Sequence, residues 1–258
     1  MSSILLAELT RDAIARLAPE ATVVLPTASI EQHGPHLAVA TDTILCTAVA
    51  RRAAEQAAGQ IPVLVAPTFC YGNSHHHFPF PGVLSLSSQV YAAAVTDVLE
   101  GLVKSGFRRL VLLNGHGGNT DLNRVIALDM ANRLGHPVQM AAAAYWDVAR
   151  PRLAEAGLIP DAHIPGHAGR FETALMLAVR PDLVDREGLA RAEDVSAQGR
   201  GPMFPLTGAT VQVHGAWGAG PGYTDAPASA TEEEGAALLA IIQEAVAAML
   251  VTFHNLNK

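Results

Sequence analysis

The most constraining feature of this 258-residue chain is the alternation of short apolar runs with longer helical stretches. Such runs are typical of strands buried on both faces, and helical stretches between them are typical of crossovers in a parallel sheet. The predicted strands cover 22–25, 63–67, 110–114 and 138–144, with a weaker one near 211–213. The predicted helices cover 43–58, 88–105, 122–134, 172–179 and 232–250. The pattern therefore predicts a three-layer α/β/α fold with a mainly parallel central sheet.

The amino-acid composition limits which partners and which cellular compartment are expected for this protein. Half of the residues are apolar (50%), which is enough to bury a substantial core, and no repeat or linker divides the chain. We therefore expect a single domain over residues 1–258. With 16% charged residues and a net charge of −7, a nucleic-acid or anionic-membrane partner is not expected. No uncharged apolar run reaches about 18 residues and no signal-peptide pattern is present, so we expect a cytoplasmic protein.

Polar residues gather directly after the first predicted strand, where ligand sites of open α/β sheets form. Glu31 and His33 follow this strand, and Asp42 comes nine residues later. Carboxylates and imidazoles are the ligands of Zn, Mn and Fe, and one carboxylate can bridge two ions. This segment is therefore a candidate for half of a two-metal site. The alternative is that Asp42 caps the next helix and that the histidines lie in a surface turn.

A second polar cluster, NGHGGN, follows the very apolar third strand. Its glycines allow a tight turn and the close approach of a ligand. His116 is therefore a further candidate metal ligand, and Gly117 a candidate substrate contact. A phosphate-binding loop is a weak alternative, because neither the Walker spacing nor GxGxxG is present.

A third cluster lies at a loop-to-helix transition and contains His167, Arg170 and Glu172. We interpret His167 and Glu172 as catalytic groups, with Glu172 also a candidate metal ligand. The alternative is a helix-capping glutamate and a solvent-facing histidine. Arg170 is a candidate partner for a substrate carboxylate, although an arginine beside a helix start is more often part of a structural salt bridge.

A fourth stretch, 71–82, contains three consecutive histidines after the second strand. Adjacent residues of an extended chain point in different directions, so at most two of these imidazoles can face one ion. Ser74 and His77 are predicted to contact substrate or to support the metal ligands. The glycine- and proline-rich region 180–225 is either a binding loop or a surface excursion.

In this order the segments resemble the creatininase (creatinine amidohydrolase) family. The resemblance rests on LPTASIEQHGPHLAVATD, YGNS, FPGVLSL, NGHGGN and HAGRFETALML. It implies a layered α/β fold, a two-metal centre at the carboxyl edge of the sheet and commonly a hexamer. It also implies that Glu31, His33, Asp42 and His116 are metal ligands, with Asp42 as the bridge, and that His167 is the catalytic histidine.

The sequence departs from creatininase itself at positions that affect the site. Creatininase has a glutamate ligand two residues after the NGH histidine, where this chain has Gly118, so Glu172 is expected to take its place. Creatininase also carries paired tryptophans before its catalytic histidine, and here the matching positions are His163 and Ile164. An aromatic clamp for creatinine is therefore missing from these positions.

The expected function is that of a metal-dependent amidohydrolase that cleaves a C–N bond of a small amide, lactam or formamide, or of a short peptide. Two divalent ions per subunit are expected, Zn with Zn, Mn or Fe as the second. A mycofactocin-type peptidase is one alternative, and a catalytically inactive metal-binding oligomeric scaffold is another. A metal-dependent phosphatase is disfavoured, because no basic clamp for phosphate lies near these motifs.

Overall fold

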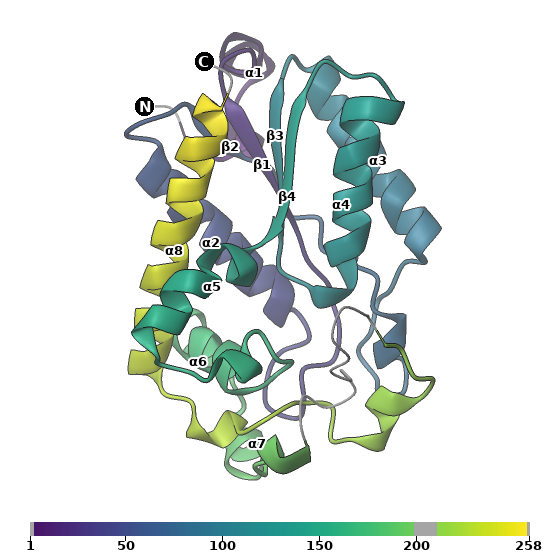
Figure 1. Ribbon diagram of the computed structural model, residues 1–258, viewed down its shortest axis with the longest axis vertical. Coiled ribbons are helices and arrows are strands. Elements are labelled where there is room, and N and C mark those ends of the chain that lie inside the picture. The colour runs from purple at the N-terminus through teal and green to yellow at the C-terminus, as the bar shows by residue number, and fades with distance from the viewer. Residues whose placement is uncertain (1–2, 199–210, 257–258) are drawn as a thin grey trace.

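The centre of the computed structural model, which describes residues 3–198 and 211–256, is a four-stranded parallel sheet. The strands lie in the order β2-β1-β3-β4, with β1 (Thr22–Thr27) and β3 (Arg109–Asn114) inside and β2 (Val63–Val65) and β4 (Gln139–Ala144) at the edges. All neighbouring pairs are parallel, so the carboxyl ends of the strands share one edge. The predicted parallel α/β architecture is confirmed (Figure 1).

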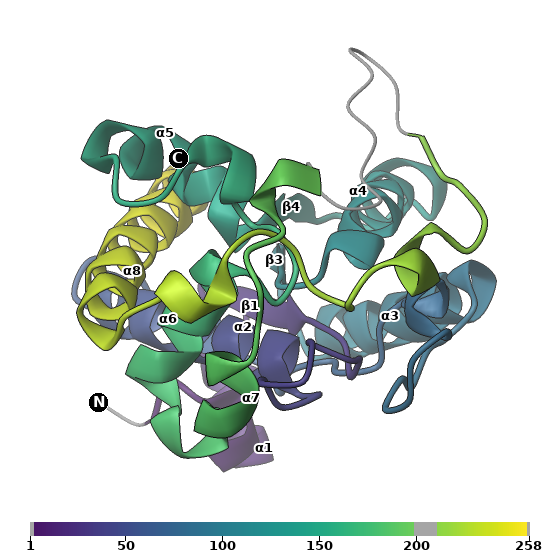
Figure 2. The same cartoon turned by 90° about the horizontal axis from the view of Figure 1, so that it is seen from below.

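Helices cover both faces of the sheet, as Figures 1 and 2 show. The described α-helices are α1 (Arg11–Leu17), α2 (Thr41–Ala57), α3 (Ser88–Lys104), α4 (Thr120–Leu128), α5 (Tyr145–Ala156), α6 (Arg170–Val179), α7 (Arg186–Ala190) and α8 (Glu232–Asn255). Single turns are η1 (Leu6–Glu8), η2 (His75–His77), η3 (Gly117–Asn119), the π-helical η4 (Asp129–Arg133), η5 (Asp161–His163), η6 (Pro181–Leu183), η7 (Ser196–Gln198), η8 (Ala216–Ala219) and η9 (Pro227–Ser229).

Successive residues of the strands feed two separate cores, because side chains alternate between the faces of a sheet. Val24 and Val111 pack with α2, α5, α6 and α8 on one face. Val23 and Leu110 pack with α1, α3 and α4 on the other. The near-continuous apolar character of the strands follows from this burial on both sides.

Helix α8 is long and apolar enough, by length and composition, to cross a membrane. In this structure it lies against α2, α5 and α6, and one of its faces, including Leu238, Ile242 and Leu250, is buried in the core. Thr231 caps its start by accepting a hydrogen bond from the Glu234 amide at 3.1 Å. The helix therefore has the packing of a core helix.

One predicted strand is wrong, and three of the described helices were not predicted. The weak strand near 211–213 is wrong, because these residues are irregular and Val213 is 50% exposed. Residues 199–210, within the region read as irregular, lie outside the described residues. Helices α1, α5 and α7 were not predicted, and α5 contains Pro151, a residue type that usually breaks helices.

The starts of two helices matter most for the site. Helix α2 begins at Thr41 with Ala40 as its N-cap, so Asp42 lies inside the first turn and is not the cap. Helix α6 begins at Arg170, so Glu172 also lies in a first turn. Both carboxylates therefore project from helix N-termini at the carboxyl edge of the sheet, where the helix dipole favours negative charge.

Candidate metal centre

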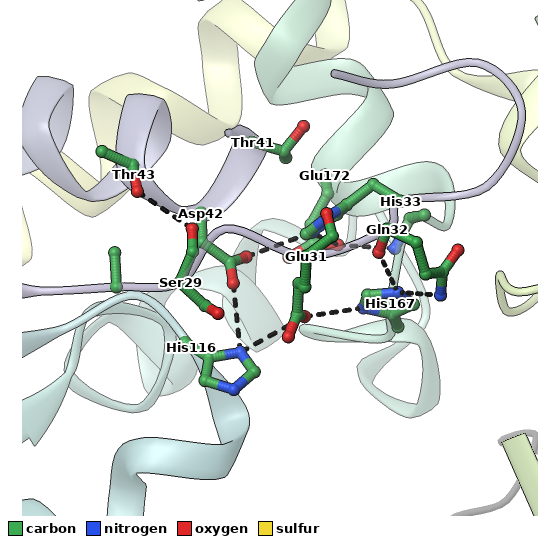
Figure 3. A network of polar contacts seen from close by, with 12 residues as sticks. Ser29, Glu31, Gln32, His33, Thr41, Asp42, Thr43, His116, His167 and Glu172 are labelled. Atoms are coloured by element: carbon green, nitrogen blue, oxygen red, sulfur yellow. Dashed lines mark hydrogen bonds and ion pairs between the residues drawn. The ribbon is translucent and has the colours of Figure 1, made fainter. Parts of the chain in front are cut away.

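Six buried polar side chains converge beyond the carboxyl ends of β1 and β3 (Figure 3). They come from the loop after β1, the first turn of α2, the loop after β3 and the start of α6, and each is at most 6% exposed. The six are Glu31, His33, Asp42, His116, His167 and Glu172. All of the predicted metal-ligating and catalytic side chains thus lie in one cluster.

The Asp42 carboxylate lies between two donor sets (Figure 3). Its Oδ1 is 3.1 Å from His33 Nε2, and its Oδ2 is 3.0 Å from His116 Nδ1. On the first side, Glu172 Oε2 lies 3.7 Å from His33 Nε2. On the second side, Glu31 Oε1 lies 3.3 Å from His116 Nδ1. Each oxygen of Asp42 therefore faces its own pair of one imidazole and one further carboxylate.

The chemistry of these donors fits divalent cations. Glu31 Oε2 and Asp42 Oδ2 are buried and make no hydrogen bond, an arrangement that is unfavourable unless another group satisfies the oxygen. Glu31, His33 and Asp42 offer ligand atoms within 4.8 Å of one another, and so do His33, His167 and Glu172. Mixed carboxylate and imidazole sets of this kind bind Zn, Mn and Fe.

Protons occupy the cluster when no cation does. Burial disfavours the charged form of His33, but the nearby Asp42 and Glu172 carboxylates raise its pKa to about 10. Burial raises the pKa of Glu172 to about 8. Burial also opposes the charge on Glu31, but the surrounding imidazoles of His116 and His77 hold its pKa well below the usual value. A cation must therefore displace protons, and its binding weakens as the pH falls.

His167 and His77 form a neutral wall beside these carboxylates. Burial lowers the pKa of His77 to about 3 and holds the pKa of His167 well below its usual value. The two rings stack with their centroids 4.2 Å apart at an interplanar angle of 24°. His167 Nδ1 lies 3.6 Å from Glu31 Oε1, and His77 Nε2 lies 3.4 Å from the same oxygen.

The segment after β2 fixes the orientation of the His116 ring, because it contacts the ring nitrogen that does not face Glu31 and Asp42. His116 Nε2 lies 3.0 Å from the Asn73 carbonyl and 3.2 Å from Ser74 Oγ. An Nε2 proton shared with these oxygens leaves the lone pair on Nδ1, which faces Glu31 and Asp42. Of the two roles predicted for Ser74, its contacts correspond to support of a metal ligand.

Comparison with known proteins decides the family. The family described as Creatininase, creatinine amidohydrolase, matches residues 7–250. The chain belongs to the creatininase family. Members of this family are metal-dependent amidohydrolases, and this chain is accordingly an enzyme that acts on C–N bonds.

Curated and solved members of the creatininase family match over most or much of the chain. Creatinine amidohydrolase of Pseudomonas putida is 32% identical over 262 residues, which span 95% of both chains. The mycofactocin precursor peptide peptidase of Mycolicibacterium smegmatis is 34% identical over 62% of this chain and 58% of its own. A crystal structure of creatinine amidohydrolase superposes with a TM-score of 0.76 at 30% identity, over 96% of this chain and 97% of that one. Other solved creatininases are described as Zn-Zn and Mn forms.

Gly118, where creatininase itself carries a glutamate, is tightly enclosed in this family member. A Cβ at Gly118 would lie 2.2 Å from the Asn73 carbonyl oxygen and 2.6 Å from His116 Nε2. A side chain here would have to displace the backbone that orients His116. Glu172, by contrast, already faces His33, so the structure places the predicted replacement carboxylate on the other side of Asp42.

We expect Gly118→Ala to lower the free energy of unfolding by about 1 to 3 kcal/mol and to weaken metal binding, because the methyl group overpacks the contact between Asn73 and His116. Thermal unfolding with and without added Zn measures both effects. Gly117→Ala is the matched control, because Gly117 is exposed and a Cβ there meets no atom within 4 Å. Equal behaviour of the two variants would show that the close approach at Gly118 is unimportant.

The prediction that Arg170 binds substrate is not supported by its contacts. Its guanidinium donates two hydrogen bonds to the Glu234 carboxylate on α8, at 2.6 and 3.0 Å. Its backbone amide donates to Asp225 Oδ1 at 2.7 Å. Arg170 therefore links α6 to α8, in agreement with the structural salt bridge that the sequence left as an alternative.

Three side chains near the cluster were not singled out from the sequence. Gln32 Nε2 lies 3.0 Å from His77 Nδ1 and 2.9 Å from His167 Nε2. His76 shares a possible ligand set with Glu31 and His116. The Trp217 ring lies 4.4 Å from the His77 ring. Gln32 lies between the predicted ligands Glu31 and His33 in the sequence, so its position near the site could have been predicted. Trp217 reaches the site only through the tertiary fold.

Proposed function

We propose that this enzyme hydrolyses a C–N bond of a small amide, lactam or formamide at a centre of two divalent ions. The observation that carries the proposal is the position of Asp42 between two separate donor sets. His33 and Glu172 complete one set, and His116 and Glu31 complete the other. Zn, Mn and Fe suit these donors, and the Zn-Zn and Mn forms described for solved creatininases support divalent ions here.

A divalent ion held by these residues would supply Lewis acidity, which would activate water and polarise a substrate carbonyl. The protein supplies the proton transfers. The carboxylate of Glu172 lies on the His33 side of the cluster, where it would hold one ion. Its Oε2 also accepts a hydrogen bond from the Ala168 amide at 2.6 Å, which fixes that oxygen beside His33.

The hydrogen bonds around Gln32 define which nitrogen of His167 faces the cluster. The Gln32 amide nitrogen lies 2.9 Å from the Gly222 carbonyl, 3.0 Å from His77 Nδ1 and 2.9 Å from His167 Nε2, and we assign its two protons to the first two. His167 Nε2 then donates its own proton to the Gln32 backbone carbonyl at 3.0 Å. The lone pair of His167 is therefore on Nδ1, the atom beside Glu31. There it accepts a proton and returns it to the departing nitrogen.

Hydrolysis of a short peptide is the second candidate function. The specific observation in its favour is the identity of 34% with a mycofactocin precursor peptide peptidase over 62% of this chain. The cluster itself serves either substrate class, because both reactions need an activated water and a protonated leaving nitrogen. Activity assays with small amides and with short peptides therefore distinguish the two substrate classes.

Metal content and activity together test the proposed function. We expect about two ions per chain by elemental analysis of the purified enzyme, and chelator-sensitive cleavage in a panel of creatinine, an N-formyl amine and a short peptide. A phosphate ester serves as the negative control substrate. An enzyme that stays inert after reloading with Zn, Mn or Fe would instead support the non-catalytic scaffold.

We expect His116→Ala to abolish tight metal loading at the Glu31 side of the cluster, because His116 is the only imidazole facing both Glu31 and Asp42 among the ion-pair contacts of the described residues. Metal titration by calorimetry measures the loss. His136→Ala is the control, because His136 pairs with Glu100 on the surface of the α3 and α4 layer. Full metal content in His116→Ala would show that His116 is not a metal ligand.

The exposed face of the α3 and α4 layer supports assembly into a homo-oligomer, which we propose together with this function. Val90 and Val98 on α3 and Val125 and Leu128 on α4 are 40–62% exposed. A second copy would cover these apolar side chains. Light scattering on a sizing column gives the mass in solution, and a monomer at micromolar concentration would contradict the assembly.

A further inference from the structure

Trp217 lies beside the catalytic cluster although its segment is far from the ligands in sequence. It belongs to η8, and its ring centroid is 4.4 Å from that of His77, 5.1 Å from that of His167 and 5.6 Å from that of His76. The indole is neither buried nor fully exposed. It thus forms an aromatic wall on the His167 side of the centre and keeps part of its surface uncovered.

Close contacts on both sides of Trp217 fix this position. A Cβ at Gly218 would lie 2.9 Å from Pro79 Cβ, so η8 packs tightly on the segment that carries the three histidines. The Gly222 carbonyl accepts a hydrogen bond from Gln32 Nε2 at 2.9 Å, and Gly222 has a positive φ of 82°. Gln32 is the same side chain that contacts His77 and His167. The placement of Trp217 is therefore tied to the histidines that it touches.

The position of the indole relative to His167 indicates which part of a substrate it would meet. In the proposed function His167 returns a proton to the departing nitrogen, so the group attached to this nitrogen lies near His167. A ligand that covers the exposed part of an aromatic side chain is stabilised by burial of apolar surface, and a planar ligand group can stack on the ring with the largest contact area. We infer that Trp217 is a specificity-determining residue that contacts the leaving group, and that it favours an uncharged planar group there. This inference rests on the proposed function.

The charges around this wall agree with an uncharged leaving group. Arg170, the arginine closest in sequence to His167, has its guanidinium bound to Glu234. The Arg170 guanidinium is therefore not available to pair with a carboxylate on the leaving group.

Intrinsic fluorescence offers a test that does not depend on turnover, because the chain has two tryptophans. Trp146 lies in the core and is 5% exposed, so Trp146→Phe leaves Trp217 as the sole reporter. The metal-loaded Trp146→Phe enzyme is titrated with acetanilide and with N-cyclohexylacetamide, an uncharged pair that differs in the flatness of the N-substituent. We expect acetanilide to change the emission saturably and to bind about tenfold more tightly.

Calorimetry on Trp217→Ala and Trp217→Phe extends the test to the residue itself. We expect Trp217→Ala to weaken acetanilide binding about tenfold and Trp217→Phe to retain most of it, both with unchanged metal content. In hydrolysis of N-aryl formamides, the same change should appear in KM more than in kcat. If Trp217→Ala binds both probes as tightly as the starting enzyme, the inference is overturned even where amides are cleaved. If binding follows Trp217 but no amide is cleaved, the contact stands and the proposed reaction fails.

Discussion

Asp42→Asn is expected to remove both metal ions and nearly all activity. Asp42 places one oxygen beside His33 and the other beside His116, so its neutralisation weakens both donor sets at once. Lewis acidity contributes several kcal/mol of transition-state stabilisation, so we expect a fall in kcat/KM of about 10³-fold or more. Elemental analysis and steady-state kinetics measure the two losses on the same sample.

Asp121→Asn is the matched control for this experiment. Asp121 lies in the first turn of α4 as Asp42 lies in the first turn of α2, but it is exposed and pairs with Arg124. Its replacement removes the same charge from a helix N-terminus, with an effect of about 0.3 to 1 kcal/mol on stability and none on metal content. Retention of one ion per chain in Asp42→Asn would argue that the two donor sets bind independently, without a shared bridge.

His167→Asn is expected to separate proton transfer from metal binding. In the proposed mechanism His167 accepts and returns a proton at Nδ1 and is not a metal ligand. The ions are held by the other five side chains of the cluster, Asp42, Glu31, His33, His116 and Glu172. We therefore expect unchanged metal content and a fall in kcat of about 10²- to 10⁴-fold, the usual contribution of general acid–base catalysis. Kinetics on a substrate with an activated leaving group should show a smaller fall, because such a group leaves without a proton.

His254→Asn controls for the loss of a buried histidine as such. His254 is 1% exposed and bonds Thr22 Oγ1 at 2.9 Å, at the amino end of β1 and opposite the cluster. We expect this variant to lose stability and to keep its kcat. Loss of metal together with activity in His167→Asn would reassign His167 as a ligand, consistent with its ligand atoms lying within 4.8 Å of those of Glu31 and His77.

The sheet and the cluster of candidate metal ligands were largely predictable, because short segments of the sequence contain the patterns that indicate both. All four described strands coincide with predicted apolar runs, and the polar residues that follow β1 and β3 must meet at the shared carboxyl edge. Helix α5 was hidden by Pro151, and the expected strand near 211–213 lacks a neighbouring strand in the described residues. Trp217 could not be placed, because no periodicity or spacing links residue 217 to the histidines at 77 and 167. Arg170 was ambiguous until Glu234 was seen beside it.

The enclosure of Gly118 limits which single substitutions the site of this chain accepts. A glutamate at position 118 would enter the space of the Asn73 carbonyl and the His116 ring, so it cannot simply be added to the present arrangement. A carboxylate ligand at this position would therefore require the 73–74 backbone to move as well. Gly118→Glu alone is expected to disturb the orientation of His116 without supplying a working ligand.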